Sequence, residues 1–329
     1  MNCFNSFTSG MHNNNNAIFI YDINEGVLNN ISTAGKTAIL KTGTTTLQAG
    51  AYGLLKLNTT YTGATIQIKK GLGGNPTDFF AQSTTTYGTL QTVGGVSLIT
   101  FLGLDTGYIT IWYDQTNNNN HATGVGNVYY NTSTNNIDFG TTGYFTLGTS
   151  AFPSGNSAYS FLFTPQNQPD NTNQVIYTGG DYSTGKYLQG MIYYNDGETG
   201  PFSYFNVWYA YNVWTKSSVS NGVIVADTPS VLNGVNISDT YNGQNANTRT
   251  LYFNGSSVPF SSADSNQIRN SVTTNNFLGN KSSAQGDTAK FTGSLKYFIW
   301  APASPTSDNI KLSLSDINIL HKVATDIVA

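Results

Sequence analysis

One stretch of this sequence holds residue types that could bind a metal ion or carry out catalysis. It runs from Tyr108 to Gly126 as YITIWYDQTNNNNHATGVG. An alternating apolar run ends at Asp114, and four asparagines precede His121. These types and spacings leave three interpretations open: a metal-binding loop, an active-site loop or a tight turn.

The metal interpretation can be compared with known ligand patterns. Calcium binds several oxygen ligands, usually including carboxylates. Asp114, Thr116 and Asn118 stand at alternating positions, as ligands do in an EF-hand loop. However, Asn119 stands where such a loop has its sharp-turn glycine, and Val125 stands where it has a bidentate glutamate. The stretch therefore fails as an EF-hand loop.

Other chemical motifs are weaker. The three histidines lie far apart in the sequence, without metal-ligand spacing. The single cysteine, Cys3, has no neighbouring base, and there is no Gly-x-Ser-x-Gly elbow or phosphate-binding loop. Asp196 and Glu198 share the segment YNDGETG, which is either a weak calcium site or a solvated hairpin tip. The sequence therefore predicts a non-enzyme without a cofactor, with calcium as the one alternative.

Aromatic residues are concentrated in one segment. FSYFNVWYAYNVW, Phe202–Trp214, holds seven aromatic residues in thirteen positions. Either both faces of this segment are buried, or one face is exposed and stacks on sugar rings or on a partner protein. The candidate binding residues are Trp208, Tyr209, Tyr211 and Trp214.

Composition excludes several classes of protein. Only 9% of the 329 residues are charged, against roughly 25% in typical domains, and 13% are aromatic. Disordered chains usually lack aromatic residues, so the chain is predicted to be folded and β-rich with an uncharged surface. The net charge is −3 and basic residues do not cluster, which excludes a nucleic-acid-binding surface. No apolar stretch approaches the ~18 residues of a membrane span, and no signal peptide is expected.

Most of the chain predicts short β-strands between turns, as in a sandwich or barrel. The clearest hairpin is RTLYFNGSSVPF, where Asn254-Gly255 supplies the positive φ of a tight turn. ATIQIKK predicts a strand with Ile66 and Ile68 on one face. Further strands are predicted at Val128–Asn131, Tyr144–Leu147, Tyr159–Phe163, Val175–Tyr177, Tyr187–Tyr194, Val207–Val213, Val223–Val225, Thr248–Phe253, Phe277–Gly279 and Leu295–Trp300.

GYITIWYD predicts a central strand, because large side chains fall on both of its faces. One face is expected to hold Tyr108, Thr110 and Trp112, and the other Ile109, Ile111 and Tyr113. The segments predicted as helical are one turn at Ala51–Leu57, a short helix in LQTVGGVSLITFLG, and a C-terminal amphipathic helix capped by Ser315. That last helix would present Ile317, Leu320, Ala324 and Ile327 on one face.

The order of several motifs resembles a known module. AYGLLKLNTTYTGATIQIKK, LITFLG and GYITIWYDQTNNNNHAT resemble a module of arabinofuranosidase B-type glycoside hydrolases and of laminin-G-like, concanavalin A-like proteins of bacteria, phages and giant viruses. The later TRTLYFNG and FTGSLKYFIWAPASPTSDN resemble the closing hairpin, last strand and terminal helix of laminin-G-like jelly rolls. The resemblance implies a two-sheet antiparallel jelly-roll sandwich over residues 49–329. Within it, the signature turn comprises Trp112, Asp114, Asn117, Asn119 and His121.

The resemblance also indicates how the chain departs from an active glycosidase. Retaining glycosidases need two carboxylates about 5 Å apart. Gln189, in YLQGMIYYN, stands where the family has its nucleophilic glutamate, and Asn280 and Lys281 stand near the position of its acid/base aspartate. Both catalytic groups are therefore expected to be absent, unless Asp196, Glu198 or Asp287 replaces them.

These observations favour a non-catalytic structural or adhesion protein of a virus or phage particle, such as a capsid-decorating or fibre protein at the virion surface. Residues 1–48 are expected to be either extra strands or a tail of the main domain, or an arm that anchors it to other particle proteins. Self-association, for example as a trimer, and binding to cell-surface glycans are expected. The alternative is an extracellular carbohydrate-binding protein or an arabinofuranosidase-like glycoside hydrolase acting alone.

Overall fold

The computed structural model describes residues 50–84, 86–116, 118–149, 151–152, 158–166, 174–181, 186–194, 203–208, 214–217, 234–241, 249–258, 260–262, 275–280, 290–303 and 315–318. The predicted extension at residues 1–48 lies outside these ranges, as does the predicted strand Val223–Val225. The helices within these ranges are short, and none is long and apolar enough to cross a membrane.

The described part of the chain is all-β, and its strands pair antiparallel. A first layer is centred on β20 (Ser294–Ala303), which pairs with β10 (Ala158–Gln166) along one edge. The other edge of β20 pairs with β1 (Gly50–Gly53) and β8 (Asn136–Asp138). Beyond β10, the layer continues through β15 (Ile237–Tyr241), β16 (Arg249–Phe253) and β17 (Ser256–Val258).

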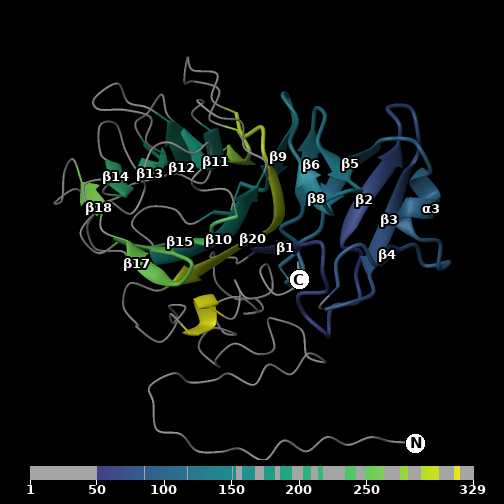
Figure 1. The fold of residues 1–329 in the computed structure, drawn as a ribbon, viewed down its shortest axis with the longest axis horizontal. Helices are drawn as coiled ribbons and strands as arrows, with labels where there is room; N and C mark the ends of the chain where they lie inside the picture. Colours follow the sequence, from purple (N-terminus) through teal and green to yellow (C-terminus); the bar gives the residue numbers. More distant parts are fainter. Residues whose placement is uncertain are drawn as a thin grey trace, which may run out of the picture.

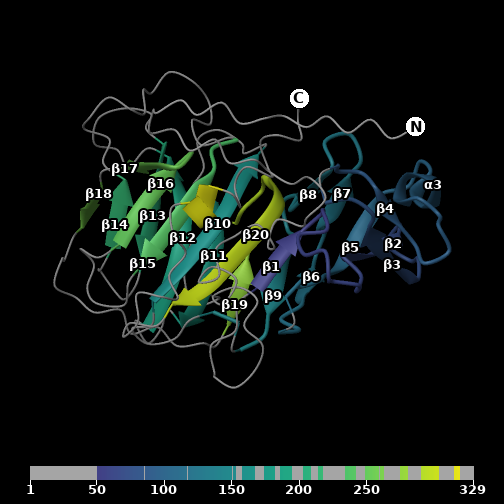
Figure 2. The same cartoon turned by 90° about the horizontal axis from the view of Figure 1, so that it is seen from below.

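A second layer continues from strand to strand across the molecule. Its pairing order is β18 (Phe260–Ser262), β14 (Trp214–Ser217), β13 (Ser203–Trp208), β12 (Lys186–Tyr194), β11 (Gln174–Asp181), β19 (Asn276–Leu278), β9 (Tyr144–Leu147), β6 (Ala122–Val125), β5 (Gly107–Trp112), β2 (Ile66–Lys70), β3 (Pro76–Ala81) and β4 (Leu90–Gln91). β7 (Tyr129–Asn131) pairs with both β5 and β8 and so joins the layers. Figures 1 and 2 show β11–β14 packed against β10, β15 and β20 at one end, with β2–β4 at the other.

Aromatic side chains fill the space between the layers. The ring of Phe161 on β10 stacks on that of Tyr177 on β11, with centroids 4.3 Å apart. Tyr177 also donates a 2.7 Å hydrogen bond from its hydroxyl to Asp239 Oδ2 on β15. All three residues are fully buried. Because the stacked rings and the hydrogen bond join strands of different layers, they fix how the two sheets face each other.

The bulge in β5 corrects the predicted face assignment. In the pairing with β2, Ile109 and Ile111 lie opposite consecutive residues, so Thr110 is an extra residue on β5. A β-bulge of this kind interrupts the alternation of side chains. Ile109 and Trp112 are both buried, so the prediction that Trp112 shares a face with Tyr108 and Thr110 is wrong. The predicted central position is confirmed, because β2 pairs with one edge of β5 and β6 and β7 with the other.

The helix predicted at Ala51–Leu57 is also wrong. Ala51 lies in β1, opposite Ile299 of β20, and non-helical backbone follows. Leu54, Leu55 and Leu57 are nevertheless buried, so their spacing marks burial rather than a helix. In LQTVGGVSLITFLG, helix α3 covers only Leu98–Leu102, with Ser97 as its N-cap, and β4 precedes it.

Several strand predictions are confirmed, including those that correspond to β2, β9, β10, β12 and β20. At the hairpin between β16 and β17, Asn254 and Gly255 have φ of 50° and 77°, as the Asn-Gly pair predicts. Of the strand predicted at Val207–Val213, residues 207 and 208 belong to β13, and residues 209–213 lie outside the described ranges. Residues 315–318 are helical, so Ser315 lies inside the helix rather than at its cap; Leu320, Ala324 and Ile327 lie outside the described ranges.

Candidate functional site

Asp114 is fully buried and organises the signature turn. Its Oδ1 accepts hydrogen bonds from the backbone N–H groups of Ala51 and Thr116, both at 2.9 Å. Its Oδ2 accepts from the Thr116 hydroxyl at 2.6 Å and from the Asn120 N–H at 3.1 Å. Burial raises the pKa of Asp114, and the hydrogen bonds from Thr116, Ala51 and Asn120 oppose that rise. The carboxyl group therefore uses both oxygens within the turn.

Gln115, also fully buried, anchors the segment that follows β1. Its Nε2 donates to the carbonyl oxygens of Gly53 at 3.0 Å and Leu55 at 2.7 Å, and its Oε1 accepts from the Leu57 N–H at 2.8 Å. Its own N–H donates to the Ala51 carbonyl at 2.8 Å. These bonds satisfy backbone groups that a non-helical, buried segment would otherwise leave unpaired. The turn thus fastens residues 51–57 to β5.

His121 has a local structural role. Its Nδ1 accepts a hydrogen bond from the Asp114 N–H at 3.2 Å. Its ring lies edge-on to that of Tyr113, with the ring centroids 4.9 Å apart. Burial lowers the pKa of His121, so the neutral imidazole that can accept this bond is favoured. Asn119 has φ of 56°, a left-handed conformation that asparagine adopts more readily than most residues, while Asn117 lies outside the described residues. Of the three interpretations of this stretch, these contacts support the tight turn.

The other predicted site residues are placed only in part. Trp208 ends β13 and Trp214 begins β14, directly opposite each other, but their side chains lie outside what the structure describes. Tyr209, Tyr211, Asp196, Glu198, Lys281 and Asp287 lie outside the described ranges altogether. Gln189 is buried on β12. Among the described residues, no three His, Cys, Asp or Glu side chains gather in a way that could hold a metal ion.

An open groove of about 430 Å³ lies over β3 and β4. It is formed by the segment after β1, the end of β3, the strand β4 and the turn that follows β4. The residues that line it are Lys56, Tyr61, Thr62, Gly63, Phe80, Ala81, Gln82, Gln91, Thr92, Val93 and Gly95. This volume falls within the range of small-molecule binding pockets.

Two aromatic residues line the groove. Phe80 follows Phe79 on β3; Phe79 is fully buried and packs on Phe101 of α3, which leaves Phe80 on the opposite, outer face. Tyr61 is held by a 2.8 Å hydrogen bond from its hydroxyl to the Ala64 carbonyl. Burial, with smaller contributions from nearby carboxylates, raises the pKa of Tyr61 to about 12, so its hydroxyl stays protonated at neutral pH. Both rings are only partly buried.

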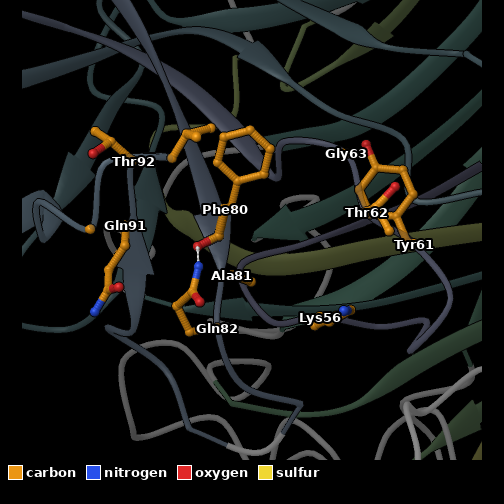
Figure 3. A pocket seen from close by; sticks show the side chains of 11 residues that line it. Lys56, Tyr61, Thr62, Gly63, Phe80, Ala81, Gln82, Gln91 and Thr92 are labelled. Carbon is orange, nitrogen blue, oxygen red and sulfur yellow. Dashed lines mark hydrogen bonds between the residues drawn. The ribbon is translucent and has the colours of Figure 1, made fainter.

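Amide and hydroxyl groups supply most of the polar lining. Figure 3 shows Gln91 and Thr92 on one side of Phe80 and Tyr61 and Thr62 on the other. Gln82 donates from Nε2 to the Phe80 carbonyl at 3.1 Å, which leaves its Oε1 as an acceptor. Among the described residues that line the groove, Lys56 is the one charged side chain and none carries a carboxylate. The groove thus offers aromatic faces beside neutral donors and acceptors.

Sequence analysis did not predict this groove. Its residues come from four segments with no shared motif, and Tyr61 and Phe80 lie in different segments rather than in one aromatic cluster. The one available signal was the alternation in PTDFFA, which puts Asp78 and Phe80 on the face opposite Phe79. Pairing of β3 with β2 and β4 is what makes that face part of a lined groove.

No protein-family model and no curated protein matches the sequence. Among solved structures, the chain is similar to a GH54 α-L-arabinofuranosidase soaked with a cyclic sulfate inhibitor, with 14% identity and a TM-score of 0.49. That match covers 82% of this chain and 62% of the arabinofuranosidase, so the chain spans less than two thirds of that protein.

Two further similar structures are carbohydrate-active proteins. One is domain 4 of a GH43 extracellular arabinanase from Geobacillus stearothermophilus in complex with arabinotriose, with 11% identity, 60% of this chain and 88% of that chain covered, and a TM-score of 0.40. The other is a Trypanosoma rangeli sialidase in complex with sialic acid, with 12% identity and a TM-score of 0.38. That match covers 66% of this chain and 32% of the sialidase. The chain is thus structurally similar, at low identity, to domains of carbohydrate-active proteins.

Proposed function

We propose that this protein binds carbohydrate, without cleaving it, through the groove lined by Tyr61 and Phe80. The observation that carries the proposal is the described lining itself: two partly exposed rings beside amide and hydroxyl groups, with Lys56 as the one charged residue among them. A sugar ring has apolar C–H faces that pack on aromatic rings and hydroxyl groups that exchange hydrogen bonds with amides.

The fold class and the family resemblance support the same proposal. We assign the two layers to the jelly-roll class of concanavalin A-like and laminin-G-like domains, on the basis of the Tyr108–Gly126 motif and the antiparallel layers. Many functions share such folds, so the fold alone assigns none. The proposal therefore rests on the groove, and the fold class is consistent with it.

The absence of catalysis is part of the proposal. A retaining glycosidase needs two carboxylates about 5 Å apart, and a carboxamide cannot form the glycosyl ester. Gln189 is buried on β12, and the groove has no lining carboxylate among its described residues. Incubation with 4-nitrophenyl arabinofuranoside is expected to release no nitrophenol above the uncatalysed rate. Release that depends on Asp196 or Asp287 would overturn the non-catalytic assignment.

Glycan binding is expected to depend on the two groove rings. Tyr61→Ala and Phe80→Ala should each weaken binding of a glycan-array ligand about tenfold or more, because each removes a stacking surface. Titration calorimetry with the array ligand measures the change. Tyr252→Ala is the matched control, since Tyr252 is a partly buried aromatic residue on β16, in the other layer. Equal losses of glycan affinity in all three variants would contradict the proposal, as would a wild-type protein that binds none of the glycans on the array.

The location of the protein on a virus or phage particle stays a prediction from the sequence, as do its self-association and the anchoring role of residues 1–48. Co-purification of the protein with an assembled particle is the direct test of the particle location, because a particle protein sediments with the particle and a free-standing binding protein does not.

A further inference from the structure

A network of side chains lies beside the groove on the outer face of β2, β3 and β5. Gln67 on β2 donates from Nε2 to Asp78 Oδ1 at 2.9 Å, and the Tyr113 hydroxyl donates to the same oxygen at 2.8 Å. Thr110, the extra residue of the β5 bulge, donates from its hydroxyl to Gln67 Oε1 at 2.8 Å. All four side chains are partly buried. Three strands therefore cooperate to fix the position of one carboxyl group.

The network leaves one carboxylate oxygen available. Asp78 Oδ1 receives both hydrogen bonds, whereas Oδ2 has no hydrogen-bond partner among the described residues. A carboxylate whose direction is already fixed loses little conformational entropy when a ligand binds to its second oxygen. Sugar hydroxyls are suitable donors to that oxygen, and hydrogen bonds to charged groups are stronger than those to neutral ones.

One aromatic residue, Tyr113, contacts this carboxylate through its hydroxyl. Tyr113 is partly exposed, and its ring lies edge-on to that of His121, with the ring centroids 4.9 Å apart. The raised pKa of Tyr113 has burial as its largest cause, followed by the hydrogen bond and charge of Asp78 and by Tyr61. Tyr61 itself lines the groove.

The strand geometry joins the two areas. Asp78 and Phe80 are two residues apart on β3, so their side chains share a face about 7 Å apart. That separation is comparable to the size of one sugar ring. The sheet itself does not require the network, because backbone pairing already joins β3 to β2 and β2 to β5.

We propose that Asp78 and Tyr113 form a second subsite, which binds the next ring of an oligosaccharide whose first ring occupies the groove. This inference rests on the proposed carbohydrate binding. It assigns the ligand class as an oligosaccharide of at least two rings. The hydroxyl groups of the second ring donate to Asp78 Oδ2, and its apolar face packs on Tyr113.

Asp78→Asn tests the subsite with little change in shape. The amide oxygen can still accept from Gln67 and Tyr113, but an NH2 group replaces the free acceptor Oδ2. We expect affinity for di- and trisaccharides to fall about tenfold, with affinity for the matching monosaccharide unchanged. The probes are arabinose, xylose, galactose and mannose with their homodimers and homotrimers, measured by calorimetry. Asp105→Asn is the control for loss of charge, because Asp105 pairs with Lys70 at an exposed site.

The outcomes separate the inference from the proposed function. If the wild type binds a monosaccharide in the groove but Asp78→Asn leaves oligosaccharide affinity unchanged, the second subsite is overturned while the groove stands. If the wild type binds none of the sugars, the proposed function fails and the inference fails with it. Tyr113→Leu provides an independent variant should Asp78→Asn lower the thermal midpoint. It too should weaken only the oligosaccharides, and equal weakening of monosaccharides would overturn the subsite.

Discussion

Asp114→Ala is expected to lower the free energy of unfolding by about 3–5 kcal/mol. The substitution leaves the N–H groups of Ala51, Thr116 and Asn120 without the acceptors they have now, in a region where the carboxylate is fully buried. Each unsatisfied buried donor costs about 1–3 kcal/mol, which exceeds what is recovered by no longer burying the carboxyl group. Urea denaturation followed by circular dichroism measures the change.

The matched control for this prediction is Asp105→Ala. Asp105 forms an exposed ion pair with Lys70 at 3.3 Å, and such pairs contribute about 1 kcal/mol or less. The loss in free energy of unfolding for Asp114→Asn should lie between those of Asp114→Ala and Asp105→Ala, because the one amide oxygen still accepts two of the hydrogen bonds. If Asp114→Ala proved as stable as Asp105→Ala, the turn would not be holding β1 as described.

Gly190→Ala is expected to lower the free energy of unfolding by about 3 kcal/mol through overpacking. A Cβ atom at Gly190 would lie 2.3 Å from two atoms of the Tyr177 ring. That ring has no room to move, since it stacks on Phe161 at 4.3 Å and its hydroxyl bonds to Asp239. The substitution therefore acts on the contact that joins the two layers. A lower urea midpoint with an unchanged denaturant slope is the expected measurement.

Gly73→Ala provides the comparison for Gly190. A Cβ atom at Gly73, in the turn between β2 and β3, would have no atom within 4 Å. This variant should be within about 0.5 kcal/mol of wild type, as for most surface substitutions. Equal stability of the two glycine variants would mean that the Tyr177 ring can shift without loss.

Many strands could be predicted from the sequence because their turn residues and apolar alternation are local patterns. The Asn254-Gly255 pair specified a hairpin turn, since both residues adopt positive φ readily. Alternation in IQIKK put Ile66 and Ile68 on the buried face of β2. The same local logic failed at Ala51–Leu57, where leucines spaced as in a helix are buried in a non-helical segment whose backbone bonds to Gln115.

The signature turn separates most clearly what local sequence determines from what tertiary structure determines. Its residue types by themselves favoured backbone hydrogen bonds to Asp114 and a left-handed conformation within the asparagine run, which Asn119 adopts, because both properties belong to single side chains and their neighbours. Only the tertiary structure decided that Asp114 and Gln115 hold β1, which lies more than sixty positions away. The groove at Tyr61 and Phe80 and the network at Asp78 were decided in the same way: strand pairing and one bulged residue, Thr110, bring together side chains whose spacing along the chain carries no common pattern.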